Sequence, residues 1–172
     1  MGHMSEKVIE TFDVVTGWAV LGNDTTNLAV TNNRVRGLKA LEFDKVDGAA
    51  NTKLAGAAKT IDTKLDEFPA HYVISWYCYV SALTDVDYAF VRIGTDASNY
   101  VEYRFADTSM TAAVFSFCNV KLSTFSATQG TGADFTDIDY LAVGVAFDAE
   151  TDALADIAID RLAILPTTLT VS

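Results

Sequence analysis

Carboxylates dominate the side chains of this sequence that could take part in chemistry. The chain holds 23 Asp and Glu against 12 Lys and Arg, with two cysteines and two histidines. His3 belongs to residues 1–4, which we interpret as a cloning scar, so His71 is the one remaining histidine. A single histidine removes most of the common catalytic and transition-metal constellations, and the sequence shows no Cys-His pair.

Two carboxylates a short distance apart could hydrolyse a glycosidic bond if one of them lay in an apolar pocket. Most of the acids here instead fall in segments of turn composition, where they accept backbone hydrogen bonds and favour solubility. These turn acids are Asp62, Asp66, Glu67, Asp85, Asp87, Asp134, Asp137, Asp148, Glu150 and Asp152. The sequence also lacks a nucleophile elbow and a phosphate-binding glycine loop. We therefore expect a protein that binds or assembles, with no enzymatic activity and no catalytic residue.

The composition limits the partners of the protein. The 172 residues are 50% hydrophobic and carry a net charge of −11, which suits one domain over residues 5–172 that buries roughly 70% of its unfolded surface. An acidic surface repels phosphates and anionic lipid, so neither nucleic acid nor membrane is an expected partner. The sequence shows no signal peptide and no apolar run near the ~20 residues of a membrane helix, which predicts a protein made in a cytoplasm.

Short runs of alternating apolar and polar residues predict β-strands and no helix. The expected strands cover residues 8–13, 18–21, 27–31, 38–46, 72–81, 88–93, 100–105, 113–122, 140–147 and 155–165, some of them short. Residues 53–58 suit either a helix or a strand, and we interpret them as leading into a strand through Ile61. This spacing predicts an all-β, jelly-roll β-sandwich of two antiparallel sheets with about nine or ten strands. The expected core unites Ile74, Trp76, Val91, Val101, Tyr103, Leu141 and Val143.

Finer features follow from the phase of the alternation. Residues 94–99 have turn composition, and a matching hairpin places Arg92 opposite Glu102 and Phe90 opposite Arg104. The apolar phase of the last strand changes at Asp160-Arg161, which predicts a bulge there. Cys78 and Cys118 lie in apolar runs, so we expect two buried free thiols in preference to a disulfide.

Aromatic and charged residues alternate with the core residues of three strands. If residues 72–81, 88–93 and 100–105 are neighbours in one sheet, their outward side chains form two rows. These rows make a predicted binding or interface face of Tyr77, Tyr79, Phe90, Arg92, Glu102 and Arg104. Such a face can stack on sugar rings or form a protein interface, and we favour the interface.

Three segments resemble carbohydrate-binding-module and galactose-binding-like jelly rolls. They are Glu10-Thr11-Phe12-Asp13 with Gly17-Trp18, Gly37 with Leu41-Glu42-Phe43, and Ile159-Asp160-Arg161-Leu162. The resemblance implies one structural calcium ion near the chain ends, held by Glu10, Asp13 and Asp160, although these could also be ordinary acids of an acid-rich chain. Sugar-binding modules often have a tryptophan where Phe115 and Phe117 stand, which places a sugar platform in doubt.

Residues 92–100, 138–143 and 147–152 together resemble phage virion proteins built on this sandwich. The resemblance implies a structural virion protein, either a capsid decoration (cement) protein or a tail-surface component. Such a protein assembles with itself, with a trimer favoured, and with a capsid or tail protein. The alternative is a carbohydrate-binding module that recognises a glycan through the aromatic face.

Overall fold

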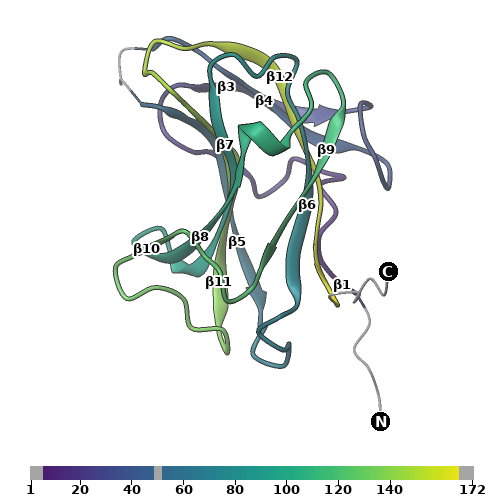
Figure 1. Ribbon diagram of the computed structural model, residues 1–172, viewed down its shortest axis with the longest axis vertical. Coiled ribbons are helices and arrows are strands. Elements are labelled where there is room, and N and C mark those ends of the chain that lie inside the picture. The colour runs from purple at the N-terminus through teal and green to yellow at the C-terminus, as the bar shows by residue number, and fades with distance from the viewer. Residues whose placement is uncertain (1–5, 49–51, 167–172) are drawn as a thin grey trace.

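The computed structural model describes residues 6–48 and 52–166, and these form two antiparallel six-stranded sheets packed face to face (Figure 1). The β6 sheet has the order β3-β4-β12-β6-β9, with β1 also paired to β12, and the β7 sheet has the order β10-β8-β7-β11-β5-β2. The predicted all-β sandwich is confirmed. The predicted scar, residues 1–4, lies outside the described part of the chain.

The strand bounds follow the predicted runs closely. The β6 sheet consists of β1 (Lys7–Glu10), β3 (Thr25–Thr31), β4 (Ala40–Lys45), β6 (Val73–Tyr79), β9 (Phe115–Lys121) and β12 (Leu154–Leu165). The β7 sheet consists of β2 (Ala19–Val20), β5 (Leu54–Thr63), β7 (Val86–Asp96), β8 (Asn99–Ala106), β10 (Ala127–Gln129) and β11 (Ile138–Phe147). One short 3-10 turn, η1 (Asp107–Ser109), is the only helical element of the described residues, and none of their helices is long and apolar enough to span a membrane. The strand β10 is absent from the prediction because three residues are too few to show alternation.

The core fills the space between the two sheets. All seven predicted core residues are at most 3% exposed, and Trp76 and Tyr103 are among the largest side chains that are fully buried. Each fully buried aliphatic or phenylalanine side chain of this core contributes roughly 1.5–3 kcal/mol to the free energy of unfolding, because it is removed from water. Both cysteines are free and buried, as predicted. The alternation of apolar residues therefore identified the inner faces correctly.

The strands β6 and β7 lie in opposite sheets, so the predicted single face of three neighbouring strands is wrong. β6 pairs with β9 and β12, whereas β7 pairs with β8 and β11. Both strands carry a fully apolar row, Trp76 and Cys78 on β6 and Val91 and Ile93 on β7. Two such rows bury more apolar surface when they face each other across the core than when they lie side by side in one sheet.

The last strand, β12, contains the predicted bulge. Its register with β6 shifts between Asp160 and Ala163, and Arg161 adopts a φ of 44°. Before the bulge β12 pairs with β4, and from Leu162 onward it pairs with β1. Because an extra residue interrupts the hydrogen-bond ladder, the bulge marks the place where β12 exchanges one neighbour for another.

Candidate functional site

The outer face of the β7 sheet carries a polar pocket of about 150 Å³. Its lining, named here the arginine pocket, consists of Tyr88, Arg92, Tyr100, Glu102, Arg104, Ala127, Thr128 and Gln129. Strands β7, β8 and β10 supply these residues (Figure 1). Three members of the predicted face therefore meet in one pocket.

Glu102 lies at the centre of the arginine pocket and bridges its two arginines. The predicted register is confirmed, since Arg92 pairs with Glu102 and Phe90 pairs with Arg104 across the β7–β8 hairpin. Nε of Arg92 donates to Oε2 of Glu102 at 2.6 Å, and Nε of Arg104 donates to Oε1 at 2.6 Å. The Glu102 side chain is only 3% exposed, so this carboxylate is a fixed part of the pocket wall.

Aromatic rings lie against both guanidinium groups. Cζ of Arg92 lies 4.8 Å from the ring centroids of both Phe90 and Tyr100, and Cζ of Arg104 lies 4.4 Å from that of Tyr88. Contacts of this kind hold a guanidinium in one orientation. With Nε bonded to Glu102, each arginine has four further N–H groups on its Nη atoms, and the Arg92 side chain also hydrogen-bonds that of Tyr140.

Electrostatics fixes the protonation of the pocket. Burial acts to lower the pKa of Arg104, but the hydrogen bond and the charge of Glu102 outweigh it and raise that pKa above its ordinary value. Burial also raises the pKa of Tyr88 and of Tyr140, whose ring lies 5.9 Å from that of Tyr100. Both phenols are therefore neutral at pH 7 and can donate and accept hydrogen bonds.

Phe90 points to the predicted outer side of β7, but it is fully buried and cannot contact a ligand. A Cβ atom on Gly144 of β11 would lie 2.7 Å from Cζ of Phe90, so the glycine leaves room for this ring. The ring of Tyr88 packs edge-on against Phe90 at 6.3 Å, and the guanidinium of Arg92 lies on it. Phe90 is a support for Arg92 and not part of an exposed surface, which corrects the prediction.

The prediction missed Tyr88, Tyr100 and Gln129, although a signal was present. The inner residues of β7 and β8 are odd-numbered, so the even-numbered Tyr88 and Tyr100 had to lie on the outer face with Arg92. Gln129 could not be found in this way, because it reaches the pocket through the pairing of β10 with β8, where it stands opposite Tyr100.

The other two residues of the predicted face, Tyr77 and Tyr79, lie on the outer side of the β6 sheet. Tyr77 packs against Phe117 with ring centroids 5.2 Å apart, and Tyr79 against Phe115 at 5.6 Å. Phe117 is 42% exposed. These four rings form a separate patch, named here the aromatic patch, on the opposite side of the sandwich from the arginine pocket.

The residues of the predicted calcium site are held by other partners. Glu10 pairs with Nζ of Lys59 at 2.5 Å and accepts from the backbone N–H of Phe12. Within the described residues, no three His, Cys, Asp or Glu side chains form a group that could hold a metal ion. The predicted set therefore fits a calcium ion poorly, because the ammonium of Lys59 neutralises one of its three carboxylates.

The other two residues of the predicted calcium site, Asp13 and Asp160, hold the segment before β4 in place through hydrogen bonds to its backbone. Oδ1 of Asp13 accepts from the N–H groups of Leu38 and Lys39 at 2.8 and 2.9 Å. Oδ2 of Asp160 accepts from those of Val35 and Arg36 at 2.7 and 2.8 Å, while its Oδ1 is buried without a hydrogen-bond partner. Burial raises the pKa of Asp160, and hydrogen bonds oppose this shift. The calcium ion itself stays a prediction.

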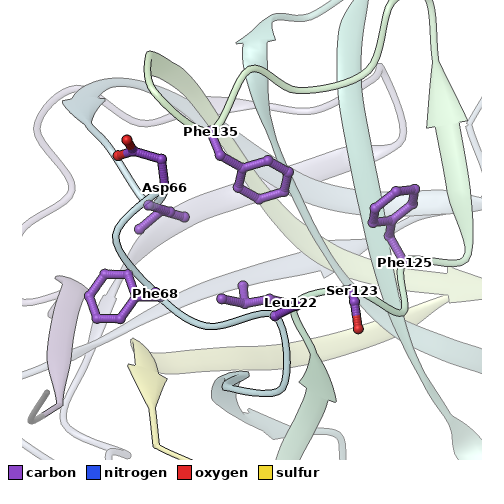
Figure 2. Close-up of a pocket in the computed structure, with 8 residues that line it drawn as sticks. Asp66, Phe68, Leu122, Ser123, Phe125 and Phe135 are labelled. Carbon is purple, nitrogen blue, oxygen red and sulfur yellow. The ribbon is translucent and has the colours of Figure 1, made fainter. Parts of the chain in front are cut away.

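A larger cavity of about 260 Å³ opens at one end of the sandwich. It is lined by Leu65, Asp66, Phe68, Ala70, Leu122, Ser123, Phe125 and Phe135, from the loops that follow β5, β9 and β10. Figure 2 shows the rings of Phe125 and Phe135 turned toward the cavity and the carboxylate of Asp66 turned away from it. Because no polar side chains converge there, this cavity lacks the means to orient a hydroxylated ligand.

Comparison with known proteins supports the fold. No family model matches the sequence, and no curated protein sequence is similar to it. A family 11 carbohydrate-binding module from Clostridium thermocellum, solved with a β-1,3-1,4-mixed-linked tetrasaccharide, has a TM-score of 0.66 at 12% identity over 95% of this chain and 97% of that chain. A family 30 carbohydrate-binding module of a cellulosomal cellulase from the same organism has a TM-score of 0.59 at 10% identity over 96% and 99%.

A third similar structure is an exo-β-agarase, with a TM-score of 0.62 at 12% identity over 92% of this chain and 24% of that chain. At such identities the likeness establishes the fold alone. The predicted resemblance to carbohydrate-binding-module jelly rolls is therefore confirmed for the fold, whereas the resemblance to virion proteins stays a prediction.

Proposed function

We propose that this protein binds a carbohydrate chain, without cleaving it, at the arginine pocket. The observation that carries the proposal is the combination of half-buried rings, Tyr88 and Tyr100, with polar groups held in fixed positions beside them. Sugar rings present apolar C–H faces and a rim of hydroxyls, which match aromatic surfaces and fixed hydrogen-bonding groups respectively. One solved structure of similar fold, the family 11 carbohydrate-binding module, is a complex with a tetrasaccharide, and this supports the proposal.

The shape of the pocket agrees with a long ligand. Its volume of about 150 Å³ is below the roughly 300–1,000 Å³ of pockets that enclose a small molecule. A ligand would therefore lie across the outer face of the β7 sheet with part of one or two sugar units in the pocket. Gln129, exposed on β10, stands at the edge where a neighbouring unit would pass.

The test is calorimetry or affinity electrophoresis of the purified protein with a panel of soluble polysaccharides. The wild type is expected to bind at least one of them, and Tyr100→Ala is expected to weaken that binding at least tenfold while the near-ultraviolet circular dichroism stays native. Tyr77→Ala on the aromatic patch is the matched control and is expected to bind like wild type. Binding that disappears in Tyr77→Ala but survives in Tyr100→Ala would move the site to the other sheet and refute this proposal.

The assembly of a virion remains a second candidate, favoured by one observation. The aromatic patch joins four rings on one outer face, and Phe117 of this patch is 42% exposed. Val114, which directly precedes β9, is 50% exposed. Exposed apolar side chains of this kind commonly mark protein interfaces. Under this hypothesis light scattering finds an oligomer that Phe117→Ser dissociates, whereas a monomer at all concentrations argues for the carbohydrate-binding function alone.

A further inference from the structure

We propose that the carbohydrate recognised by the arginine pocket is an acidic one, with a carboxylate or sulfate group that binds the Nη atoms of Arg92 and Arg104. This inference rests on the proposed function and names the chemical class of its ligand. It follows from the charges, the hydrogen bonds and the orientation of the two guanidinium groups.

The arginine pocket carries an excess of positive charge. Two arginines line it against one carboxylate, Glu102. The protein as a whole has a net charge of −11, so a positive pocket differs from the average of its surface. Asp87, exposed and outside the lining, also acts on Arg104, as the weakest of the influences on its pKa. A neutral sugar would leave the extra positive charge without a partner, whereas an anionic group would neutralise it.

Glu102 cannot satisfy both arginines. Each of its two oxygens accepts from one Nε atom, so a single negative charge is shared between two guanidinium charges. An arginine has five N–H donors, four of them on the Nη atoms. Those four form the fork that binds a carboxylate or a sulfate through two parallel hydrogen bonds. The pocket therefore holds two guanidinium groups oriented by Glu102. Arg92 also donates to the Tyr140 hydroxyl, so Arg104 offers more of its N–H groups to a ligand.

The aromatic rings keep these forks in place. Two rings, those of Phe90 and Tyr100, lie against the guanidinium of Arg92, and one, that of Tyr88, lies against that of Arg104. The N–H groups point from the guanidinium edges, and an anionic group binds there. The side chain of Arg104 is 39% exposed and that of Arg92 is 12% exposed. Arg104 is therefore the arginine that a ligand meets first.

The experiment measures the affinity of the full chain for three oligosaccharides of equal length by calorimetry. One is a galacturonic acid oligomer with carboxylates, one a sulfated galactan oligomer, and one a neutral β-1,3-1,4-glucan oligomer. We expect at least one acidic oligomer to bind at least tenfold more tightly than the neutral one, and the comparison between the two acidic oligomers identifies carboxylate or sulfate. Raising NaCl from about 0.01 M to about 0.15 M shortens the range of charge interactions from roughly 30 Å to roughly 8 Å and should weaken only the acidic binding.

Two variants with the same change of net charge separate a site from general attraction. Arg104→Gln should weaken binding of the acidic oligomer about tenfold or more, as expected for the loss of a charged hydrogen-bond donor. Lys121→Gln, on the exposed side of β9, should bind like wild type. Asp87→Asn should bind the acidic oligomer more tightly, because it removes a nearby negative charge.

The measurements separate failure of the acidic-ligand inference from failure of the proposed carbohydrate binding. If the neutral oligomer binds as tightly as the acidic ones and Arg104→Gln has no effect, the acidic ligand is wrong but carbohydrate binding stands. If Lys121→Gln weakens acidic binding as much as Arg104→Gln, the attraction is not specific to the pocket and the inference fails. If no saccharide of the panel used for the proposed function binds at all, both proposals are refuted.

Discussion

Glu102 accepts a hydrogen bond from Nε of Arg92, its cross-strand partner, at 2.6 Å, although the carboxylate is almost completely buried on the outer face of a sheet. A buried charge is tolerated only where partners replace its water. Here the guanidinium groups of Arg92 and Arg104 replace that water. Glu102 and these two arginines therefore stabilise the fold as well as forming part of the proposed site.

Substituting Glu102→Gln should test this structural role. The amide keeps the size of the side chain but leaves two close arginines without a counter-charge. Because Arg104 is partly exposed and screened by solvent, we expect the free energy of unfolding to fall by about 2 kcal/mol, less than for a fully buried pair. Urea denaturation measures this change.

The matched control for Glu102→Gln is Glu67→Gln. Glu67 is 48% exposed and lies 3.7 Å from Nζ of Lys7, so its ion pair should contribute less than about 1 kcal/mol. Equal urea midpoints for the two variants would contradict the structural role of Glu102.

Lys45 illustrates a different use of a buried charge. Its Nζ donates to the carbonyl oxygens of Val46, Glu150 and Asp152 at 2.8–2.9 Å and lies 3.7 Å from Oδ2 of Asp24, with both side chains fully buried. Lys45→Met removes the donor to three carbonyls and leaves Asp24 without its counter-ion, although Oδ2 of Asp24 still accepts from the N–H of Thr52. We expect a loss of about 3–5 kcal/mol in the free energy of unfolding.

The double variant Lys45→Met/Asp24→Asn identifies the cause of that loss. If the carboxylate left without its counter-ion dominates, removing its charge restores part of the stability, and the cycle of single and double variants gives the coupling. A Lys45→Met protein with the urea midpoint of wild type would show that these contacts of Lys45 do not stabilise the fold.

Asp160 should make the stability depend on pH in an unusual direction. Burial raises its pKa in the folded state above the ordinary 3.8, so the folded protein binds a proton before the unfolded chain does as the pH falls. Protonation therefore stabilises the fold in that window. Compared with Asp160→Asn, which cannot titrate, wild type should gain melting temperature as the pH is lowered from about 7 to about 4.

Asp134 supplies a control of opposite sign. Its hydrogen bonds with Thr136 lower its pKa, so its contribution is present above the ordinary pKa and lost as the pH falls through the folded value. The difference between wild type and Asp134→Asn should accordingly shrink on acidification. If acidification changes the stability difference between wild type and Asp160→Asn in the same direction as that between wild type and Asp134→Asn, Asp160 does not cause the predicted pH dependence.

The implied calcium ion is tested by chelation. If Glu10, Asp13 and Asp160 hold an ion, a chelator lowers the melting temperature at pH 7, added calcium restores it, and Asp160→Asn abolishes the response. If the chelator leaves the melting temperature of wild type unchanged, no calcium ion stabilises the fold.

The two cysteines should be inert in the native protein. Both are free and buried, and burial raises the pKa of Cys78 to about 12 and that of Cys118 still further. Since the thiolate is the reactive form, a thiol reagent should label neither cysteine at pH 8 in buffer and both in guanidinium chloride. Rapid labelling of the native protein would contradict the packing described here.

The order of residues along the chain was enough to predict every described strand except β10, the inner faces of the strands, the β7–β8 register and the bulge at Asp160-Arg161. These features are local, because alternation has a period of two and a short turn fixes the register of its hairpin. The sequence pattern did not reveal that β6 faces β7 across the core, that β10 brings Gln129 beside Tyr100, or that Phe90 is covered. These facts depend on which distant strands pair, and the pattern within a single strand carries no information about its neighbours.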